Sequence, residues 1–154
     1  MVFVEGYDGE RNKISQVNLM SAECANILKL RKEKANVPVS GINGTVCTIK
    51  SKLNATISNA ENSFKEEMEF LIVSNITDRT PSTTLDIENL ELPPNVKLSD
   101  SEFFKPSKIQ LLLGIDPFFK IFKCNKIKIG DSLTLQDTVI PYLADEDYFK
   151  RTVN

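Results

Sequence analysis

Apolar and polar residues alternate regularly through the middle of this chain. Between positions 47 and 58, beginning with Cys47, small or apolar side chains fall on every odd position and polar side chains fall between them. Alternation with a period of two is typical of a strand with one face in the core and the other in water. After a polar break at 59–63, the segment 64–72 shows the same period. The pattern predicts two long neighbouring strands joined by a turn. The apolar positions of the second strand are Phe64, Met68, Phe70 and Ile72.

A second pattern runs from Lys108 to Gly130, and we expect the rest of the fold to be organised around it. It opens with an apolar run that ends at Gly114, as in a strand that is buried on both faces. The glycine marks a place where this backbone passes close to another one. The residues from Lys126 onward alternate and predict a closing strand.

A short helix is expected between those two strands. Asp116 fits the N-cap because its carboxylate accepts orphan amide hydrogens, and Pro117 fits the first helical position because it has no N–H to leave unsatisfied. The next residues are almost all apolar, so the helix should be pressed against the core. We therefore expect Leu112 of the first strand and Phe119 of the helix to be almost fully buried. The apolar helix residues are Phe118, Phe119, Ile121 and Phe122.

Shorter signals predict the elements before the central strands. Ser21 fits a helix N-cap, with Glu23 in the favourable first turn, and the helix should end near Leu30. A hairpin tip is expected where glycine and asparagine, which tolerate positive φ, are clustered. The predicted buried stripe of the helix consists of Cys24, Ala25 and Leu28, and the predicted tip consists of Gly41, Ile42, Asn43 and Gly44.

The remainder of the chain carries fewer periodic residues. The stretch 77–108 is rich in proline and acids, which predicts a long connection. Leu133 and Leu135 predict a short strand, and the acidic, polar segment 142–154 predicts a loose tail.

Composition excludes several kinds of chemistry. The 154 residues, 41% of them hydrophobic, fit a single domain with a sizeable core. The formal net charge of -2 and the scattered lysines and arginines offer no basic field for nucleic acid. Histidine is absent, which removes Ser-His-Asp and Cys-His catalysis and most zinc sites. We expect no metal, no cofactor and no nucleic-acid partner, and carboxylate chemistry remains open.

Cysteine usage and hydropathy bear on the compartment. Cys24, Cys47 and Cys124 are odd in number and widely spaced, so we expect reduced core thiols rather than a disulfide framework. The first residues lack the features of a signal peptide, and no apolar run approaches the ~20 residues of a membrane span. An intracellular, cytoplasmic protein without a membrane partner is expected.

The order of buried strand, Leu-Leu-Gly-x-Asp, apolar helix and closing strand resembles the retropepsin-like aspartic peptidases. More narrowly, LLLGIDPFFKIF and the following KIKIGDSLTLQDT resemble the second half of the protease domain in Pao/BEL-type retrotransposon polyproteins. VPVSGINGT and LSDSEFFKPSKIQLLLG, further upstream, resemble the same family. The resemblance covers residues 15–138. It leaves 1–14 as a divergent N-terminal segment and 139–154 as a divergent polar tail.

This resemblance implies a fold and an activity. The fold would be mainly β, a retropepsin-like closed barrel with one or two short helices. The activity would be hydrolysis of a polypeptide substrate, with Gly41 to Gly44 at the tip of a flap that covers the cleft. An ordinary hairpin is the alternative for that tip. Gly114 and Asp116 would lie near the site in structural roles; for Asp116, helix capping is favoured over a catalytic role.

The catalytic turn departs from the family pattern. In the family it reads Asp-Ser-Gly-Ser-Gln, and Ser15 and Gln16 match its last two residues, which places the catalytic position on Asn12 and the Ser-Gly pair on Lys13 and Ile14. The enzymes need two carboxyl groups that share a proton, one to polarise the peptide carbonyl and one to activate water. An asparagine amide does neither, so this resemblance implies an inactive peptidase.

A substitute carboxylate exists at Asp8, followed by Gly9, but it would require the segment 10–14 to be looped out. A lone Asp-Gly is more often a plain turn. The first hypothesis is therefore a retrotransposon-derived aspartic endopeptidase domain that has lost its catalytic activity. The second is a pseudoprotease that binds extended peptides under the flap or dimerises with an intact relative.

The ends of the chain predict weak assembly or none. Retropepsin-like dimers are held by interleaved terminal strands and by paired catalytic turns. Here only Val2 to Val4 could form an N-terminal strand, while Pro141 removes a ladder donor and the acids at 145–147 would repel their symmetry mates. We expect a monomer, or a homodimer weaker than micromolar.

Overall fold

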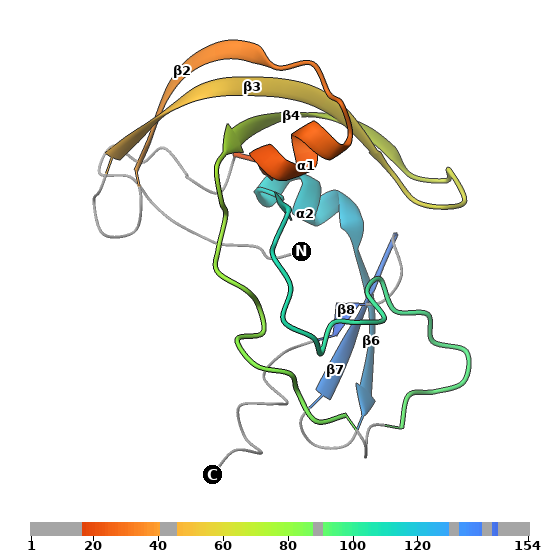
Figure 1. Ribbon diagram of the computed structural model, residues 1–154. Coiled ribbons are helices and arrows are strands. Elements are labelled where there is room, and N and C mark those ends of the chain that lie inside the picture. The colour runs from red at the N-terminus through yellow and green to blue at the C-terminus, as the bar shows by residue number, and fades with distance from the viewer. Residues whose placement is uncertain (1–16, 41–45, 88–90, 130–132, 140–142, 145–154) are drawn as a thin grey trace. The chain divides into compact units, whose positions relative to one another are not determined.

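The computed structural model describes residues 17–40, 46–87, 91–129, 133–139 and 143–144. Within them the protein is mainly β and contains two short helices (Figure 1). The elements in chain order are β1 (Leu19–Ser21), α1 (Ala22–Ile27), β2 (Glu33–Ser40), β3 (Val46–Ser58), β4 (Lys65–Val73), β5 (Leu111–Leu112), α2 (Ile115–Ile121), β6 (Phe122–Ile129), β7 (Leu133–Thr138) and β8 (Leu143–Ala144).

The strands form two sheets, and neither closes on itself. One has five strands in the order β2-β3-β4-β1-β5, and the other has three in the order β6-β7-β8. The expectation of a closed barrel is therefore wrong for the described residues. Closure would require the edge strands of a sheet to pair. In the larger sheet, β5 has only two residues and β2 contains Pro38, which cannot donate to a ladder.

The chain divides into two compact units, and each unit gathers segments that are separated in the sequence. The first holds the five-stranded sheet and the second holds the three-stranded sheet and the long connection. The first unit comprises Met1–Ser58, Lys65–Asp78 and Lys108–Lys120; the second comprises Asn59–Phe64, Arg79–Ser107 and Ile121–Asn154.

The predicted pair of long strands is confirmed as β3 and β4. They run antiparallel, with Leu53 opposite Phe70. Both of these side chains are buried, as the alternation required. Cys47 is exposed, contrary to expectation. It lies at the start of β3, where the strand pairs only with β2 and extends past the region paired with β4 (Figure 1), so less of the core covers it.

The strand β1 lies inside the first sheet. It runs parallel to β4, with Leu19 opposite Leu71, and antiparallel to β5, with Leu19 opposite Leu112. Met20 points into the core and is 1% exposed. Leu112 is half-buried rather than fully buried, because β5 is the edge strand of the sheet. The buried apolar residues of this unit are Met20, Ala25, Ile49, Leu53, Met68, Phe70, Leu71, Ile109 and Leu113.

The helix α1 begins as predicted and ends early. The Ser21 side chain caps it by accepting from the Cys24 N–H at 3.0 Å. The helix stops because Lys29 has a positive φ of 53°, and the Leu30 N–H bonds back to the Ala25 carbonyl at 3.0 Å. This is a Schellman ending. Leu28 is therefore 56% exposed, so its place in the predicted stripe is wrong, whereas Ala25 is fully buried.

The helix α2 differs from its prediction in start and in burial. Its first internal bond runs from the Phe118 N–H to the Gly114 carbonyl at 3.3 Å, so Gly114 holds the N-cap position and Asp116 lies within the first turn. Ile121 is fully buried, but Phe119 is 73% exposed. The expectation that Phe119 is buried is wrong because one side of α2 faces away from the core. On that side the Phe119 ring contacts the Phe118 ring edge to face.

The second unit contains a sheet that begins directly after α2. β6 starts at Phe122, earlier than predicted, and a bulge separates that residue from Lys126. β7 confirms the strand expected around Leu135, which is fully buried. β8 was not expected: Leu143 pairs with Gln136, so the predicted loose tail contributes a short strand.

The predicted long connection is confirmed for its described residues, which contain no helix and no strand, only bridge positions at Thr80, Leu98 and Ser107. Thr80 and Ser107 exchange both backbone hydrogen bonds, at 2.8 and 3.2 Å, and so close the segment into a loop. Inside that loop the Leu85 N–H donates to the Phe104 carbonyl at 2.9 Å.

Two phenylalanine truncations test this division between core and surface. Phe70→Ala should lower the free energy of unfolding by about 3 to 5 kcal/mol, because Phe70 is fully buried and a cavity would remain. Phe119→Ala should lower it by at most about 1 kcal/mol, because that ring is mostly in water. Urea denaturation of the two variants measures both values, and equal losses would contradict the placement of α2.

Candidate functional site

The side chain of Asn18 connects three segments of the first unit, just after the predicted catalytic turn. Its amide nitrogen donates to the Glu69 carbonyl of β4 at 3.0 Å. Its side-chain oxygen accepts from the Gly114 N–H at 2.9 Å, and its main-chain carbonyl accepts from the Leu71 N–H at 2.9 Å. One residue therefore fixes the approach to β1 against both neighbouring strands.

Gly114 lies where the sequence placed a close passage of backbones. It is buried, and its N–H meets the Asn18 side chain while its carbonyl starts α2. Both polar groups of this residue thus have partners. Asp116, two residues later, is exposed in the first turn of α2, where a negative charge is favoured by the helix dipole.

A polar cluster surrounds the start of α1. The Ser21 hydroxyl donates to the Gln110 side chain, and the Ser21 N–H donates to the Gln110 carbonyl at 2.9 Å. Glu23 forms an ion pair with Lys108 at 3.3 Å. Hydrogen bonds from Lys108 and then Gln110, together with the Lys108 charge, hold the pKa of Glu23 below its ordinary value. Burial raises the pKa of the Cys24 thiol in the same helix, which disfavours a reactive thiolate.

Two of the predicted site residues belong to the described part of the chain, and the others do not. The predicted catalytic position and its neighbours lie outside the described residues, as does the whole predicted hairpin tip. Gly114 and Asp116 are described and lie together at the start of α2. The residues outside are Asp8, Asn12, Ser15, Gln16, Gly41, Ile42, Asn43 and Gly44.

Sequence reasoning did not single out Asn18 or Gln110. The available signal was their position: each is polar in a segment whose other residues are apolar, Val17 to Met20 and Ile109 to Leu113. A polar side chain inside such a segment must find a partner, and here each bonds to the backbone or side chain of the neighbouring element.

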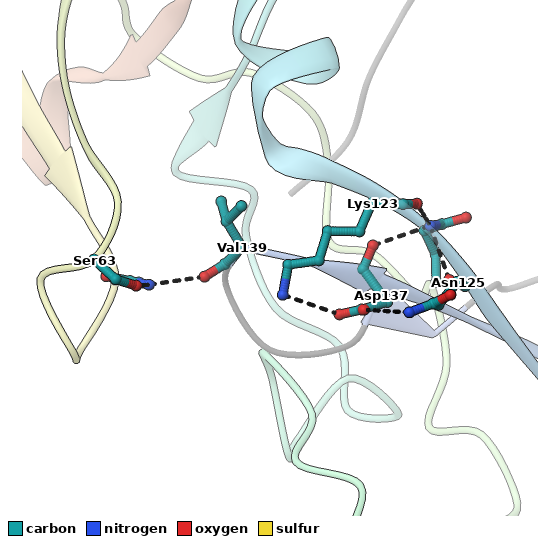
Figure 2. Close-up of polar contacts among 7 residues, drawn as sticks. Ser63, Lys123, Asn125, Asp137 and Val139 are labelled. Atoms are coloured by element: carbon teal, nitrogen blue, oxygen red, sulfur yellow. Dashed lines mark hydrogen bonds and ion pairs between the residues drawn. The ribbon is translucent and has the colours of Figure 1, made fainter.

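The second unit has its own polar cluster, at the bulge of β6 (Figure 2). Asp137 contacts the Lys123 ammonium at 3.6 Å and the Asn125 amide at 3.4 Å. The Gln136 amide donates to the carbonyls of Lys123 and Asn125, at 2.6 and 3.2 Å. The Gln136 bonds satisfy carbonyls that the bulge takes out of the regular ladder. The contacts with Lys123 and Asn125 tie the Asp137 carboxylate to the fold.

The Asn59 side chain bridges the two ends of the turn between β3 and β4. Its amide donates to the Ser63 hydroxyl at 2.8 Å and to the Val139 carbonyl at 2.9 Å (Figure 2), and its side-chain oxygen accepts from the Phe64 N–H at 3.0 Å. The Val139 N–H in turn donates to the Ile121 carbonyl at 2.8 Å. Asn59 is buried with every side-chain polar atom bonded, which indicates a structural role.

The described part of the chain contains no group of three or more acidic or cysteine side chains arranged to hold a metal ion. Nor does it contain a helix with the length and apolar character needed to cross a bilayer. No protein-family model, curated protein or solved structure matches this chain.

The Asn18 contacts can be tested by truncation. Asn18→Ala should lower the free energy of unfolding by about 1 to 3 kcal/mol, because it leaves the buried Gly114 N–H without its acceptor. Asn54→Ala, on the exposed side of β3, is the matched control and should change it by no more than about 0.5 kcal/mol. Chemical denaturation measures both; an equal cost would contradict the role given to Asn18.

The ion pair of Glu23 has a predictable pH dependence. Because its pKa is lowered in the folded state, its contribution to stability is present above the ordinary glutamate pKa of about 4.3 and is lost as the pH falls through the folded value. Lys108→Met should raise the pKa of Glu23 toward the ordinary value, as measured by NMR of the side-chain carboxyl carbon. Lys52→Met, which removes the partner of Glu69 instead, should leave the pKa of Glu23 unchanged.

Proposed function

We propose that this chain is a retropepsin-like aspartic peptidase domain, related to those of Pao/BEL-type retrotransposon polyproteins, whose catalytic turn has lost its aspartate. It is an endopeptidase by descent and has no peptidase activity. The observation that carries the proposal is the sequence Asn12-Lys13-Ile14 in front of Ser15-Gln16, within a chain that otherwise resembles the family in order from 15 to 138.

Local structure around the proposed site supports this. The segment that follows Gln16 leads into β1, which is held between β4 and β5 by backbone pairing on both sides and by Asn18. A catalytic turn needs such a rigid base, since a displacement of about 1 Å is enough to spoil catalysis. The strands β2 and β3 pair up to Ser40 and Val46, so antiparallel arms flank the proposed flap tip.

The chemistry of the substitution supports the loss of activity. With an amide at position 12, neither the proton donor nor the proton acceptor of the dyad is present. General acid-base catalysis contributes about 10²- to 10⁴-fold, so its loss raises the barrier by roughly 3 to 5 kcal/mol. Lys13 and Ile14 replace a Ser-Gly pair, and a β-branched isoleucine does not take the positive φ that glycine allows.

Restoring the turn is the direct test. The purified chain should not cleave an unstructured peptide library between pH 3 and pH 7. Any recovery of cleavage that pepstatin inhibits should require the triple variant Asn12→Asp, Lys13→Ser, Ile14→Gly, while Asn12→Asp alone should not recover it, because Ile14 would still distort the turn. Pepstatin-sensitive cleavage by the unmodified chain that disappears in Asp8→Asn would show instead that Asp8 serves as the catalytic carboxylate.

Peptide binding without cleavage is the second function, and the paired arms of β2 and β3 favour it because they are retained although the turn is altered. The same assay distinguishes it. If the unmodified chain holds extended peptides, an excess of it should slow cleavage by the triple variant through sequestration of substrate, whereas a chain without a binding cleft should leave the rate unchanged.

A further inference from the structure

One sheet edge of this protein has a regular segment that is unpaired on its outer side within the described residues. β6 is the outer strand of the three-stranded sheet and pairs only with β7 (Figure 1). An edge strand presents a row of backbone N–H and C=O groups that another extended chain can join. From Lys126 to Ile129 the register with β7 is continuous, so this half of β6 is a regular template.

The other sheet edges are protected in ways that β6 is not. β2 carries Pro38, which lacks an N–H, and a bulge between Lys34 and Val37. β5 and β8 have two residues each, too few for a second ladder. Proline and short length are common devices against unwanted pairing. β6 has no proline, and its one irregularity lies before Lys126.

The charges on β6 are all of one sign. Lys126 and Lys128 are exposed on the same face, while Ile127 and Ile129 alternate with them and are half-buried. Lys123, further up the strand, is paired with Asp137. Among the described residues, no ion pair is formed by Lys126 or Lys128.

We propose that the β6 edge from Lys126 to Ile129 is a docking site for an acidic peptide, which adds to the three-stranded sheet as a further strand. The peptide that fits it alternates carboxylate and apolar residues. Its carboxylates would lie across from the two lysines and its apolar side chains across from the two isoleucines, because cross-strand neighbours share a face. Main-chain hydrogen bonds supply affinity in this mode of recognition, and the alternating side chains supply specificity.

Charge argues against the competing occupants. A second copy of this chain that joined through β6 would bring Lys126 and Lys128 against the same lysines, and like charges across strands are destabilising. Nucleic acid is disfavoured because the net charge of the whole chain is -2. The site belongs to the second unit and does not rest on the proposed peptidase descent.

The test uses a capped octapeptide of alternating glutamate and valine, titrated into the full chain at low salt. Amide chemical shifts of residues 126–129 should change, and binding should weaken as salt rises because exposed charges are screened. A peptide of alternating lysine and valine should bind at least about tenfold more weakly than the glutamate peptide. The glutamate peptide N-methylated at every residue keeps its charge, cannot donate backbone hydrogen bonds, and should not bind.

Charge reversal on the protein completes the experiment. The variant Lys126→Glu, Lys128→Glu should lose about tenfold in affinity for the glutamate peptide and should gain affinity for the lysine peptide. Lys34→Glu, Lys50→Glu makes the same change of net charge in the other sheet and should leave the affinity unchanged. If the reversed variant fails to fold, Lys126→Gln, Lys128→Gln replaces it and should weaken binding to a smaller extent.

Four results would overturn the proposal. These are an absence of shift changes on β6, equal binding of the N-methylated peptide, tighter binding of a single-stranded oligonucleotide than of the glutamate peptide, and self-association through β6 in sedimentation of the free chain at about 10 μM. Binding that follows the lysines and requires the peptide backbone would support it.

Discussion

The insertion of β1 between β4 and β5 is the constraint on which the first unit depends. A strand of only three residues forms few backbone hydrogen bonds, yet it is the one that connects the β2-β3-β4 layer to β5. Two polar side chains supplement those bonds. Asn18 bonds to Glu69 and Gly114 before the strand, and Ser21 bonds to Gln110 while it caps α1 after the strand. Asn18, just before β1, and Ser21, its last residue, therefore fix its register.

Under the proposed descent, this constraint also explains how a changed catalytic turn is compatible with an ordered fold. Among the described residues, the contacts that hold β1 are made by residue 18 and those after it, and none of these contacts needs the chemistry of positions 12–14. A carboxylate dyad stabilises a transition state and contributes nothing to the burial of Met20 or Leu113 in the core. Under the proposed descent, activity is removed by one turn while the packing that defines the unit remains.

Local sequence signals predicted those parts of the fold that local physics decides. The period of two in β3 and β4 correctly assigned Leu53 and Phe70 to the core, and a side chain that can accept amide hydrogens located the start of α1. The errors concern tertiary context. Phe119 is as apolar as Phe70, and nothing in its neighbours along the chain shows that its side of α2 faces water. Leu28 was misplaced because a lysine, rather than a glycine, ends the helix with a positive φ.

The site and the sheet edges were less predictable still, because their partners are far apart in sequence. Asn18 meets Gly114 across 96 positions, a pairing that no periodicity encodes. β8 forms because β7 offers an edge to Leu143, although its own segment is mostly polar and acidic. Once the sheets are known, however, the sequence of each edge becomes informative. A proline in β2 removes a donor and so weakens pairing with any incoming strand, whereas lysines in β6 leave the donors intact and discriminate by charge. The two edges therefore differ in kind: one disfavours pairing in general, and the other is selective.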